Sequence, residues 1–594
     1  MTRPTLRGVL RWATVLALIP GIPASGNALD SGTRTGILLP STDCARPSRG
    51  GDVVLFGDER IPTCPSPGSG WSQLRSQAPA GSPSPDECLS GLVDTRCEEW
   101  VSRFDNPYSH AGGGFKGDLL RDMVLSPDGK RLYATGVTWD ERTGSELSDR
   151  WDWLTVAFDA GTGEKLWNTQ YNGDLNQGDS AYDIAISPDG QRVYVTGITD
   201  VQDRFDYATV AYDAVSGDQL WVARQNGPLD AVDWAQSLAM SPDGSTVYVT
   251  GHTSGSNGFD VFTVAYAAAT GATMWTARWA GPGGANDWGF LVDADPDGDR
   301  VYVAGSTERL EGGSTRTEII VLAYEAKETE RSGQLLWESR FVDPTRDFES
   351  DVPNDMAIGA DGTVFLTGRV WRGIVEQDVS GCFCYDFGTA AFRGSDGVQQ
   401  WTARYRGPHA DFNIAYGLAV DPESGRVFVT GGASGELPSG LDYDIATVAY
   451  DVQSGNELWA RSYSGLPFRV EAGGAVAVSS DGESVYTTGY SAPDWPIGEA
   501  GFIVGPLRYE GSSADFTTIK YVAATGEEGW VARYNSSAAG NDTDIPYAVA
   551  ASPDGNHVYV GGQFWNQVDP QGATYPAAPY RVNLYDYGMV AYEA

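Results

Sequence analysis

The sequence is poor in the residues on which catalytic and nucleic-acid-binding sites usually depend. Only 4 of its 594 residues are histidines, spread widely along the chain, so no metal-ligand spacing or Ser-His-Asp set is indicated. Lysine and arginine number 40 against 79 aspartates and glutamates, and the formal net charge is −39. This charge argues against nucleic acid and anionic membrane surfaces as partners, because both attract basic proteins. The chain also lacks a G-x-G-x-x-G at a strand-to-helix junction and a phosphate-binding P-loop.

Long hydrophobic runs are missing beyond the N-terminus. Residues 1 to 28 combine three arginines, a short apolar core from Val15 to Ile22 and small residues at 26 to 28, which is typical of a secretory signal peptide. The apolar core is much shorter than the ~20 residues that a membrane span needs, and no later stretch approaches that length. We therefore expect a secreted or periplasmic protein without a membrane span.

Cysteine is scarce as well, with 6 in the chain. Residues 29 to 96 form an N-terminal extension rich in Ser, Pro and Gly, without a strand period. Four cysteines fall in or beside it: Cys44, Cys64, Cys88 and Cys97. In an exported chain an even count favours disulfides over a metal site, and three pairings of these four are open. Cys382 and Cys384 are one residue apart, which does not fit a Cys-x2-Cys zinc knuckle. We expect a structural role for all six, with a redox role as the alternative.

What the chain does contain is a repeat, seen most clearly in residues 183 to 224. An apolar strand, Ser-Pro-Asp-Gly, VYVTG, a loop, TVAYD, a Ser-Gly turn and LW-x-x-R follow one another. Ser-Pro-Asp-Gly suits a tight reversal, and Val, Tyr and Thr favour strands, so each copy predicts four strands. The eight turn glycines recur roughly every 54 to 73 residues: Gly129, Gly190, Gly244, Gly298, Gly362, Gly425, Gly482 and Gly555. This period predicts an all-β fold, an eight-bladed β-propeller over residues 97 to 594.

The two ends of the chain predict how the ring closes. Seven repeat tryptophans follow the turns, and an eighth, Trp100, lies upstream of the first turn. The C-terminus stops after the third strand of the last repeat, whereas residues 97 to 105 supply an unmatched fourth strand. Joining them predicts a last blade built from both ends of the chain, which leaves no open sheet edge.

One motif carries a family resemblance. Ala-x-Asp-x-x-[Thr/Ser]-Gly-x-x-x-Trp occurs at 157–167, 211–221 and 449–459, and resembles the tryptophan-docking motif of quinoprotein-type, PQQ-like repeat, eight-bladed propellers. The VYVTG strands also resemble the secreted bacterial β-propeller repeat. The resemblance implies the fold, and it raises a pyrroloquinoline-quinone dehydrogenase as one possible activity. That family usually covers the quinone with two adjacent cysteines, whereas Cys382-Phe383-Cys384 departs by one residue. We therefore expect no cofactor.

Two acidic positions recur through the repeats, both at the predicted top face. One lies eight residues before the turn: Asp118, Asp179, Asp233, Asp287, Asp351, Asn413, Glu471 and Asp544. The other opens the third strand: Asp152, Asp206, Asp260, Glu318, Asp386, Asp444, Asp515 and Asp586. A residue repeated in every blade usually serves every blade, here by accepting loop backbone N–H bonds. The alternative is a carboxylate-lined central funnel of a hydrolase or lyase.

Candidate binding residues come from two further patterns. Long loops at 369–385, 490–514 and 563–585 are rich in aromatics and should rise from the top face, which makes Trp371, Trp495, Trp565 and Tyr575 candidates for ligand binding. Asp293, Asp295 and Asp297 resemble the start of a calcium loop, D-x-D-x-D-G, but position 12 is alanine and the stretch also aligns with the ordinary hairpin. Calcium is therefore the only metal that the sequence raises.

Together these patterns favour a secreted, non-enzymatic propeller that binds a protein or carbohydrate through its top-face loops. We expect a monomer. The alternatives are a quinoprotein oxidoreductase, supported by the docking motif, and a hydrolase or lyase, supported by the acidic positions alone.

Overall fold

The computed structural model describes the propeller with gaps at many loops. The described residues are 98–104, 117–139, 151–174, 178–201, 204–311, 314–327, 329–341, 351–371, 385–407, 413–421, 425–435, 443–465, 470–492, 514–535, 544–566 and 584–594. Within these ranges the elements are strands and turns, and no helix is found that could cross a membrane.

The strands form eight units of four, called blades one to eight here. Blade one has β2 (Asp118–Leu125), β3 (Arg131–Trp139), β4 (Trp151–Asp159) and β5 (Lys165–Tyr171). Blade two has β6 (Ser180–Ile186), β7 (Arg192–Asp200), β8 (Phe205–Asp213) and β9 (Gln219–Gln225). Blade three has β10 (Asp233–Met240), β11 (Thr246–Ser254), β12 (Phe259–Ala267) and β13 (Thr273–Trp279). Blade four has β14 (Asp287–Ala294), β15 (Arg300–Glu311), β16 (Ser314–Glu325) and β17 (Leu335–Arg340).

The second half of the chain repeats this order. Blade five has β18 (Val352–Ile358), β19 (Val364–Trp371), β20 (Tyr385–Phe392) and β21 (Gln399–Tyr405). Blade six has β22 (Ile414–Asp421), β23 (Arg426–Ser434), β24 (Tyr443–Asp451) and β25 (Glu457–Tyr463). Blade seven has β26 (Val470–Val478), β27 (Ser484–Ala492), β28 (Asp515–Val522) and β29 (Glu528–Tyr534). Blade eight has β30 (Ile545–Ala551), β31 (His557–Asn566), β32 (Leu584–Glu593) and β1 (Glu98–Phe104).

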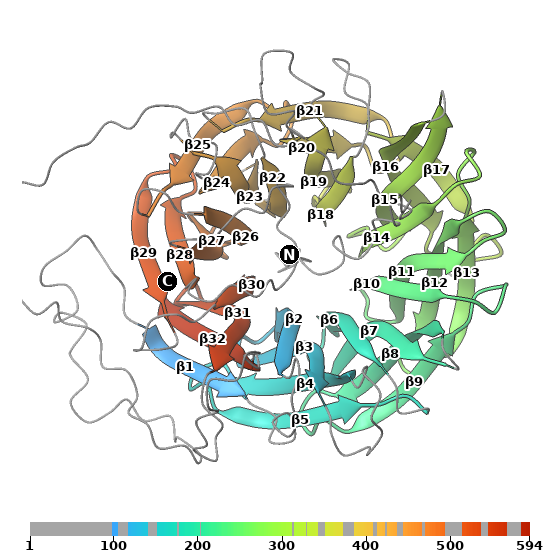
Figure 1. The fold of residues 1–594 in the computed structure, drawn as a ribbon, viewed down its shortest axis with the longest axis horizontal. Helices are drawn as coiled ribbons and strands as arrows, with labels where there is room; N and C mark the ends of the chain where they lie inside the picture. Colours follow the sequence, from blue (N-terminus) through green and yellow to red (C-terminus); the bar gives the residue numbers. More distant parts are fainter. Residues whose placement is uncertain are drawn as a thin grey trace, which may run out of the picture.

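The blades are antiparallel sheets arranged in a ring, which confirms the predicted eight-bladed propeller. The first strand of each blade lies nearest the axis and the fourth lies at the rim (Figure 1). Blades six and seven also touch through one parallel pair, Tyr443 with Val470.

The predicted closure is confirmed as well. β1 pairs antiparallel with β32, from Glu98 opposite Tyr592 to Phe104 opposite Tyr587. The last blade therefore takes its outer strand from the N-terminal side of the chain, and the ring has no unpaired third strand at this junction.

The Ser-Pro-Asp-Gly hairpins explain why the first two strands of a blade turn back so tightly. In blade two the Ser187 hydroxyl donates to Asp189 at 2.5 Å and accepts the backbone N–H of Arg192 at 2.9 Å. Gly190 has a φ of 71°, a left-handed conformation that glycine adopts without strain. The side chains of the turn thus satisfy its backbone groups, as the sequence predicts.

The repeat tryptophans join each blade to the next. The Trp221 indole N–H donates to the Ala268 carbonyl in blade three at 3.0 Å, and its ring lies against Gly271. A Cβ on Gly271 would come within 2.6 Å of that ring, so the Gly of the motif makes room for the indole. Trp100 of β1 does the same for blade one, donating to Ala160 at 3.1 Å beside Gly163. Trp100 is therefore the missing eighth tryptophan.

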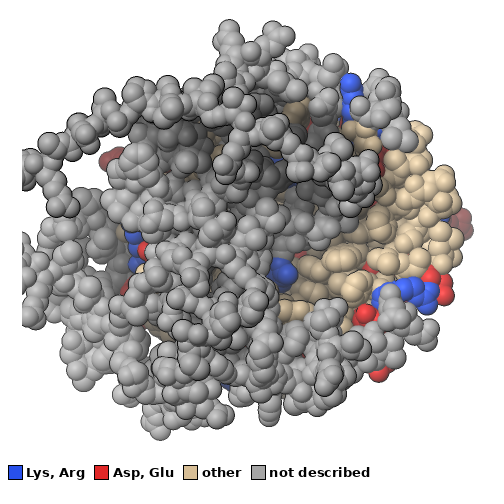
Figure 2. All heavy atoms as spheres, in the orientation of Figure 1, with Lys and Arg blue, Asp and Glu red and all other residues tan. Residues whose placement is uncertain are grey.

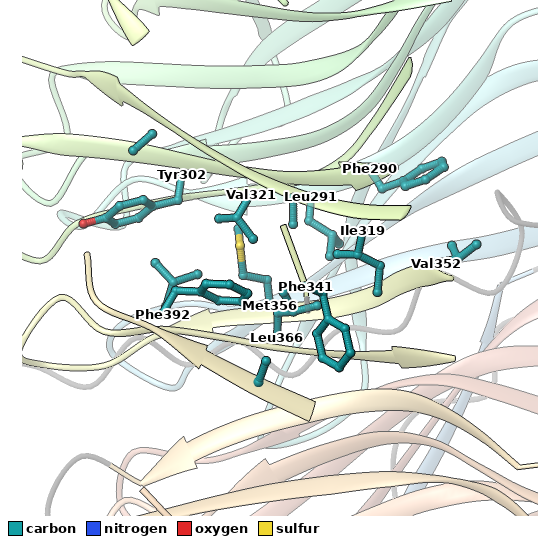
Figure 3. Close-up of a cluster of buried hydrophobic side chains, with 14 of the residues drawn as sticks. Phe290, Leu291, Tyr302, Ile319, Val321, Phe341, Val352, Met356, Leu366 and Phe392 are labelled. Atoms are coloured by element: carbon teal, nitrogen blue, oxygen red, sulfur yellow. The ribbon is translucent and has the colours of Figure 1, made fainter. Parts of the chain in front are cut away.

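The hydrophobic core is divided among the spaces between blades. Between blades four and five it contains Leu291, Val321, Met356, Leu366 and Phe392, all buried (Figure 3). Similar clusters fill the other junctions. Because neighbouring blades share these side chains, the ring acts as a rigid frame for the residues at its axis and its loops.

Candidate functional site

The first recurrent acidic position holds the top-face turns together. In blade two, Asp179 accepts the backbone N–H of Gly173 at 2.7 Å and that of Asp200 at 3.1 Å. Asp233 accepts the N–H of Gly227 at 2.5 Å, and Asn413 accepts that of Gly407 at 3.1 Å. The bonds tie the connection between blades to the inner hairpin, which confirms the structural role predicted for this position.

These carboxyl groups are also hard to ionise. Burial raises the pKa of Asp179 to about 6, although its hydrogen bonds oppose the shift. Burial likewise raises the pKa of Asp233, Asp287 and Glu471. Perturbed carboxyl groups can mark catalytic sites, but a structural network perturbs them equally, and here the same environment recurs from blade to blade.

The second acidic position serves its own blade through different partners from those predicted. Asp386 accepts from Arg404 at 3.1 Å and from Arg406 at 3.0 Å. Glu318 accepts from Arg340 at 2.5 Å, and this arginine also belongs to the outer strand. We expected loop N–H donors. In blades three, four, five and eight the arginine three residues after the repeat tryptophan contacts the acid instead. In blade two the equivalent Arg224 bonds to Tyr171 and Asp174.

The calcium-like stretch forms a hairpin in blade four. Asp295 accepts from the Tyr302 hydroxyl at 2.9 Å and from the N–H of Asp297 at 3.2 Å. Asp295 occupies the position of Ser187 but accepts from different donors, since the Ser187 hydroxyl accepts the backbone N–H groups of Gln191 and Arg192. Among the described residues no three His, Cys, Asp or Glu side chains are grouped as metal ligands. Calcium binding by Asp293, Asp295 and Asp297 stays a prediction.

Of the four predicted aromatic ligand-binding residues, only Trp371 has a described side chain, so their grouping stays a prediction. Trp371 is 7% exposed at the end of β19, and its ring packs edge-on against Tyr385 at 5.3 Å. Trp565 lies in β31 opposite Tyr585, and its side chain is outside the description. Trp495, Tyr575 and all six cysteines lie outside the described residues. On the face in Figure 2, the described surface carries acidic and basic side chains next to each other, without a patch of one sign.

A feature that we did not predict lies on the innermost strands. Each carries a β-bulge at the same register, so that one residue is left without a partner on the second strand. We call these eight bulge residues the inner ring. They are Arg121, Tyr182, Gln236, Phe290, Asn354, Tyr416, Gly474 and Tyr547. The inner ring holds six residue types at its eight positions, with tyrosine at three of them, although its backbone geometry repeats.

The glycine of VYVTG explains why the bulge recurs. A Cβ on Gly197 would overlap the carbonyl oxygen of Ser180, two residues before the bulge. The equivalent glycines of the other seven blades meet the equivalent carbonyl in the same way. Glycine at this position therefore lets the innermost strand approach closely, and the extra residue of the bulge is turned out of the ladder.

The side chains of the inner ring lie across the innermost strand of the next blade. The Arg121 guanidinium lies 5.9 Å from the centre of the Tyr182 ring, and this ring lies 5.8 Å from that of Trp234. Asn354 donates to the Ala415 carbonyl at 2.6 Å. The strands that carry the inner ring are the innermost layer of the propeller, so these eight positions belong to the strands nearest its axis (Figure 1).

Tyrosines dominate the side of the inner ring formed by blades six to eight. Burial raises the pKa of Tyr416 and of Tyr547 to about 12, against the opposing charges of Arg369 and Arg121 respectively. Blade seven has Gly474 at this position, and Tyr490 of its second strand interacts electrostatically with both tyrosines. These hydroxyls stay protonated at physiological pH and can donate or accept hydrogen bonds.

Two members of the inner ring, Arg121 in blade one and Gln236 in blade three, carry buried polar atoms without partners in the described structure. Gln236 is 1% exposed, and neither its amide oxygen nor its amide nitrogen has a hydrogen-bond partner in the described structure. The Arg121 Nε is buried and lacks a partner in the same sense. Each buried polar group left unpaired costs about 1–3 kcal/mol, so this arrangement is a cost to folding that a bound molecule could offset.

The carboxylates next to the inner ring are engaged elsewhere. Asp183 follows Tyr182 and accepts the backbone N–H of Leu238 in blade three at 2.7 Å. Asp122 accepts that of Ile184 in the same way at 3.2 Å, and Asp355 accepts that of Leu418 at 2.7 Å. These bonds join successive innermost strands. The inner ring itself contains no carboxylate, in a chain whose net charge is −39.

Sequence reasoning missed the inner ring because it assumed unbroken alternation in the first strand. Two signals were present. The glycine after VYVT recurs in all eight copies although no turn requires it. The residue three places after the first recurrent acidic position, in contrast, varies from arginine to glycine. A position that changes chemistry between otherwise regular repeats is where function can enter.

Comparison with known proteins agrees with this architecture. A family model described as "Outer membrane protein assembly factor BamB", a PQQ-like repeat family, matches residues 153–261 and 260–501. The chain belongs to this family. A search of curated proteins gave no match.

Several solved structures match the chain at low identity. Quinohemoprotein alcohol dehydrogenase from Comamonas testosteroni is 13% identical, with 84% of this chain and 76% of that chain covered and a TM-score of 0.40. Chaetomium thermophilum Sqt1, bound to the N-terminus of the ribosomal protein L10, is 11% identical, with 85% and 100% covered and a TM-score of 0.46. Periplasmic gluconolactonase PpgL of Pseudomonas aeruginosa is 17% identical, with 63% and 94% covered and a TM-score of 0.36. At these values the similarity says nothing about activity.

Proposed function

We propose that this chain is an exported, non-enzymatic binding protein that uses the axial and top-face side of its propeller. The observation that carries the proposal is the use of the recurrent acids. Asp179 holds loop N–H groups, Asp386 holds outer-strand arginines and Asp183 holds the next blade. Carboxylates with these fixed partners are poor general bases or metal ligands, because catalysis would have to break the bonds that hold the blades.

Export is supported by the signal-like segment at residues 1 to 28 and by the family description. The family description names an assembly factor, and a propeller with varied loops on a rigid ring suits contacts with other proteins. For this chain, both the compartment and the partner remain part of the proposal.

The quinoprotein alternative fits the described residues poorly. A quinone site needs a divalent ion held by oxygen ligands and a carboxylate base near the reacting carbon. The inner ring has no carboxylate, and neighbouring Asp122, Asp183 and Asp355 bond to backbone N–H groups. We derive no reaction step through pyrroloquinoline quinone.

Calorimetry separates the two functions. The exported chain is titrated with pyrroloquinoline quinone, with and without calcium, and is assayed for dye-linked oxidation of alcohols and aldoses. We expect no stoichiometric binding and no turnover, while a quinoprotein alcohol dehydrogenase run in parallel shows both. A calcium-dependent isotherm accompanied by turnover would overturn the binding-protein proposal.

A further inference from the structure

We propose that the inner ring of blades one to three binds an acidic sugar, with Arg121 on its carboxylate, Tyr182 against its ring and Gln236 on its hydroxyls. This inference rests on the proposed function, since it names the ligand class for a binding site at the propeller axis. The three residues occupy the same bulge register on successive innermost strands, so they form one continuous arc.

The anionic group of the ligand follows from Arg121. Its guanidinium stacks on Tyr182, and its buried Nε has no hydrogen-bond partner among the described residues. No described carboxylate forms an ion pair with it, although acids outnumber bases about two to one in the chain. The neighbouring Asp122 bonds to Ile184 of the next blade. The Arg121 guanidinium can therefore form an ion pair with the carboxylate of a ligand.

The sugar character follows from Gln236 and the aromatic rings. Gln236 is 1% exposed and leaves both a donor and an acceptor unsatisfied, which matches hydroxyl groups that can donate and accept. Tyr182 and Trp234 are tilted against each other with centres 5.8 Å apart, and supply flat apolar faces for the C–H groups of a pyranose. A purely aromatic acid would leave the Gln236 amide without partners.

Packing does not require a polar residue at position 236. Blade four has Phe290 at the same bulge register, where it is 9% exposed and belongs to the buried cluster that also holds Val352 and Met356 of the next blade. An apolar side chain is therefore compatible with this place in the fold. The amide of Gln236 is better explained by what it binds than by the blade that carries it.

The test is calorimetry on the full exported chain with short oligomers of galacturonate and of glucuronate. Neutral galactose and glucose oligomers of the same length and benzoate serve as the comparison ligands. We expect saturable binding of at least one uronate oligomer. The neutral oligomers should bind with an affinity about tenfold or more lower. Arg121→Gln and Gln236→Leu should each weaken binding by about tenfold or more. Arg309→Gln, on an exposed arginine of β15 paired with Glu318, should leave it unchanged.

Thermal melting establishes that each variant is folded. Gln236→Leu should melt no lower than the parent, since it removes two unpartnered polar groups. Absence of uronate binding, equal binding of neutral oligomers, a preference for benzoate, or uronate binding indifferent to Arg121→Gln and Gln236→Leu would each overturn the inference. These results would overturn only the acidic-sugar site. The proposed binding function is overturned by calcium-dependent quinone binding with turnover, so the two proposals can fail separately.

Discussion

At the scale of single residues, burial governs the recurrent carboxyl groups more strongly than neighbouring charge does. Asp179 is 1% exposed, and desolvation raises its pKa from 3.8 to about 6 even though two backbone N–H groups favour its charged form. The folded state therefore binds a proton at Asp179 more tightly than the unfolded chain does. Ionising this carboxyl is a cost to the native state at neutral pH.

Stability should accordingly rise as the solution is acidified from about pH 6.5 toward pH 4. Between the unfolded and folded pKa values the native state holds more protons, so the free energy of unfolding falls as pH increases. The contribution of Asp179 is at most about 3 kcal/mol, fully lost above its folded pKa. Asp179→Asn should flatten the pH dependence in this window, since blade six already holds Asn413 in the equivalent turn.

Chemical denaturation at a series of pH values measures this effect. Asp189→Asn is the matched control, because hydrogen bonds from Ser187 and the turn backbone lower the pKa of Asp189. The ionised carboxylate of Asp189 stabilises the fold. Protonating it below about pH 4 should therefore lower the free energy of unfolding, which is the opposite of the change expected for Asp179. An unchanged slope between pH 4 and 6.5 in Asp179→Asn would contradict the assignment.

Single residues also show where reading the sequence succeeds. The structural role of Asp179 was predictable, because an acid kept in nearly every repeat must serve the repeat. The role of Arg404 was not, since its partner Asp386 lies on the neighbouring strand and the pairing depends on strand register. The unsatisfied amide of Gln236 could not be predicted either, because alternation alone would assign it to an ordinary strand face.

At the scale of elements, the bulged innermost strand sets the properties of the propeller axis. The glycine after VYVT allows the close approach, and the bulge then presents one variable residue per blade. The residue after the bulge bonds to the following blade where it is polar, as Asp183 does to Leu238. The β-bulge thus provides both a link between blades and a position whose side chain can vary.

Replacing that glycine should be strongly destabilising. In Gly197→Ala the new methyl group would overlap the Ser180 carbonyl, which belongs to the buried backbone and cannot move without opening the bulge. We expect a loss of about 3 kcal/mol or more in the free energy of unfolding. The matched control is Gly161→Ala, where the nearest atom to the new Cβ is the Asp159 carboxylate at 3.5 Å. Denaturant titration should show a change within about 0.5 kcal/mol for this control. Equal losses in the two variants would contradict the close-approach argument.

The bounds of the strands were predictable only in part. The pattern predicts a second strand from Val193 to Thr196, whereas β7 runs from Arg192 to Asp200. The pattern marks only the apolar centre, and pairing continues into polar residues wherever the partner strand supplies it. For the same reason the longer hairpin of blade four, which pairs as far as Glu311 with Ser314, was not predicted.

At the scale of the whole molecule, the number of blades and the closure were predictable because they follow from counting. Eight turns against seven downstream tryptophans required an eighth tryptophan, and Trp100 supplies it. The role of the long loops was not predictable in this way, since their lengths and compositions follow no repeat.

Export carries a prediction about the cysteines. If the chain is exported, the mature protein denatured without reductant should show few free thiols by reaction with a thiol reagent, because an oxidising compartment favours disulfides. Denaturation with reductant gives the full count of 6 as the control. Six reactive thiols in the unreduced sample would contradict the disulfide prediction.

Closure of the ring by β1 carries the last prediction. Deleting residues 97 to 105 removes the partner of β32 from Tyr587 to Tyr592, together with the Trp100 bond to Ala160. The exposed β32 would become an open sheet edge next to a core that has lost Phe104, so we expect a lower melting temperature and self-association in size-exclusion chromatography. Trp100→Ala alone should cost about 3–5 kcal/mol, because it leaves a cavity against Gly163 and unpairs the Ala160 carbonyl. Deleting residues 29 to 80 instead should have little effect on melting. If the deletion of 97 to 105 melted at the temperature of the intact chain, β1 would not be what closes the propeller.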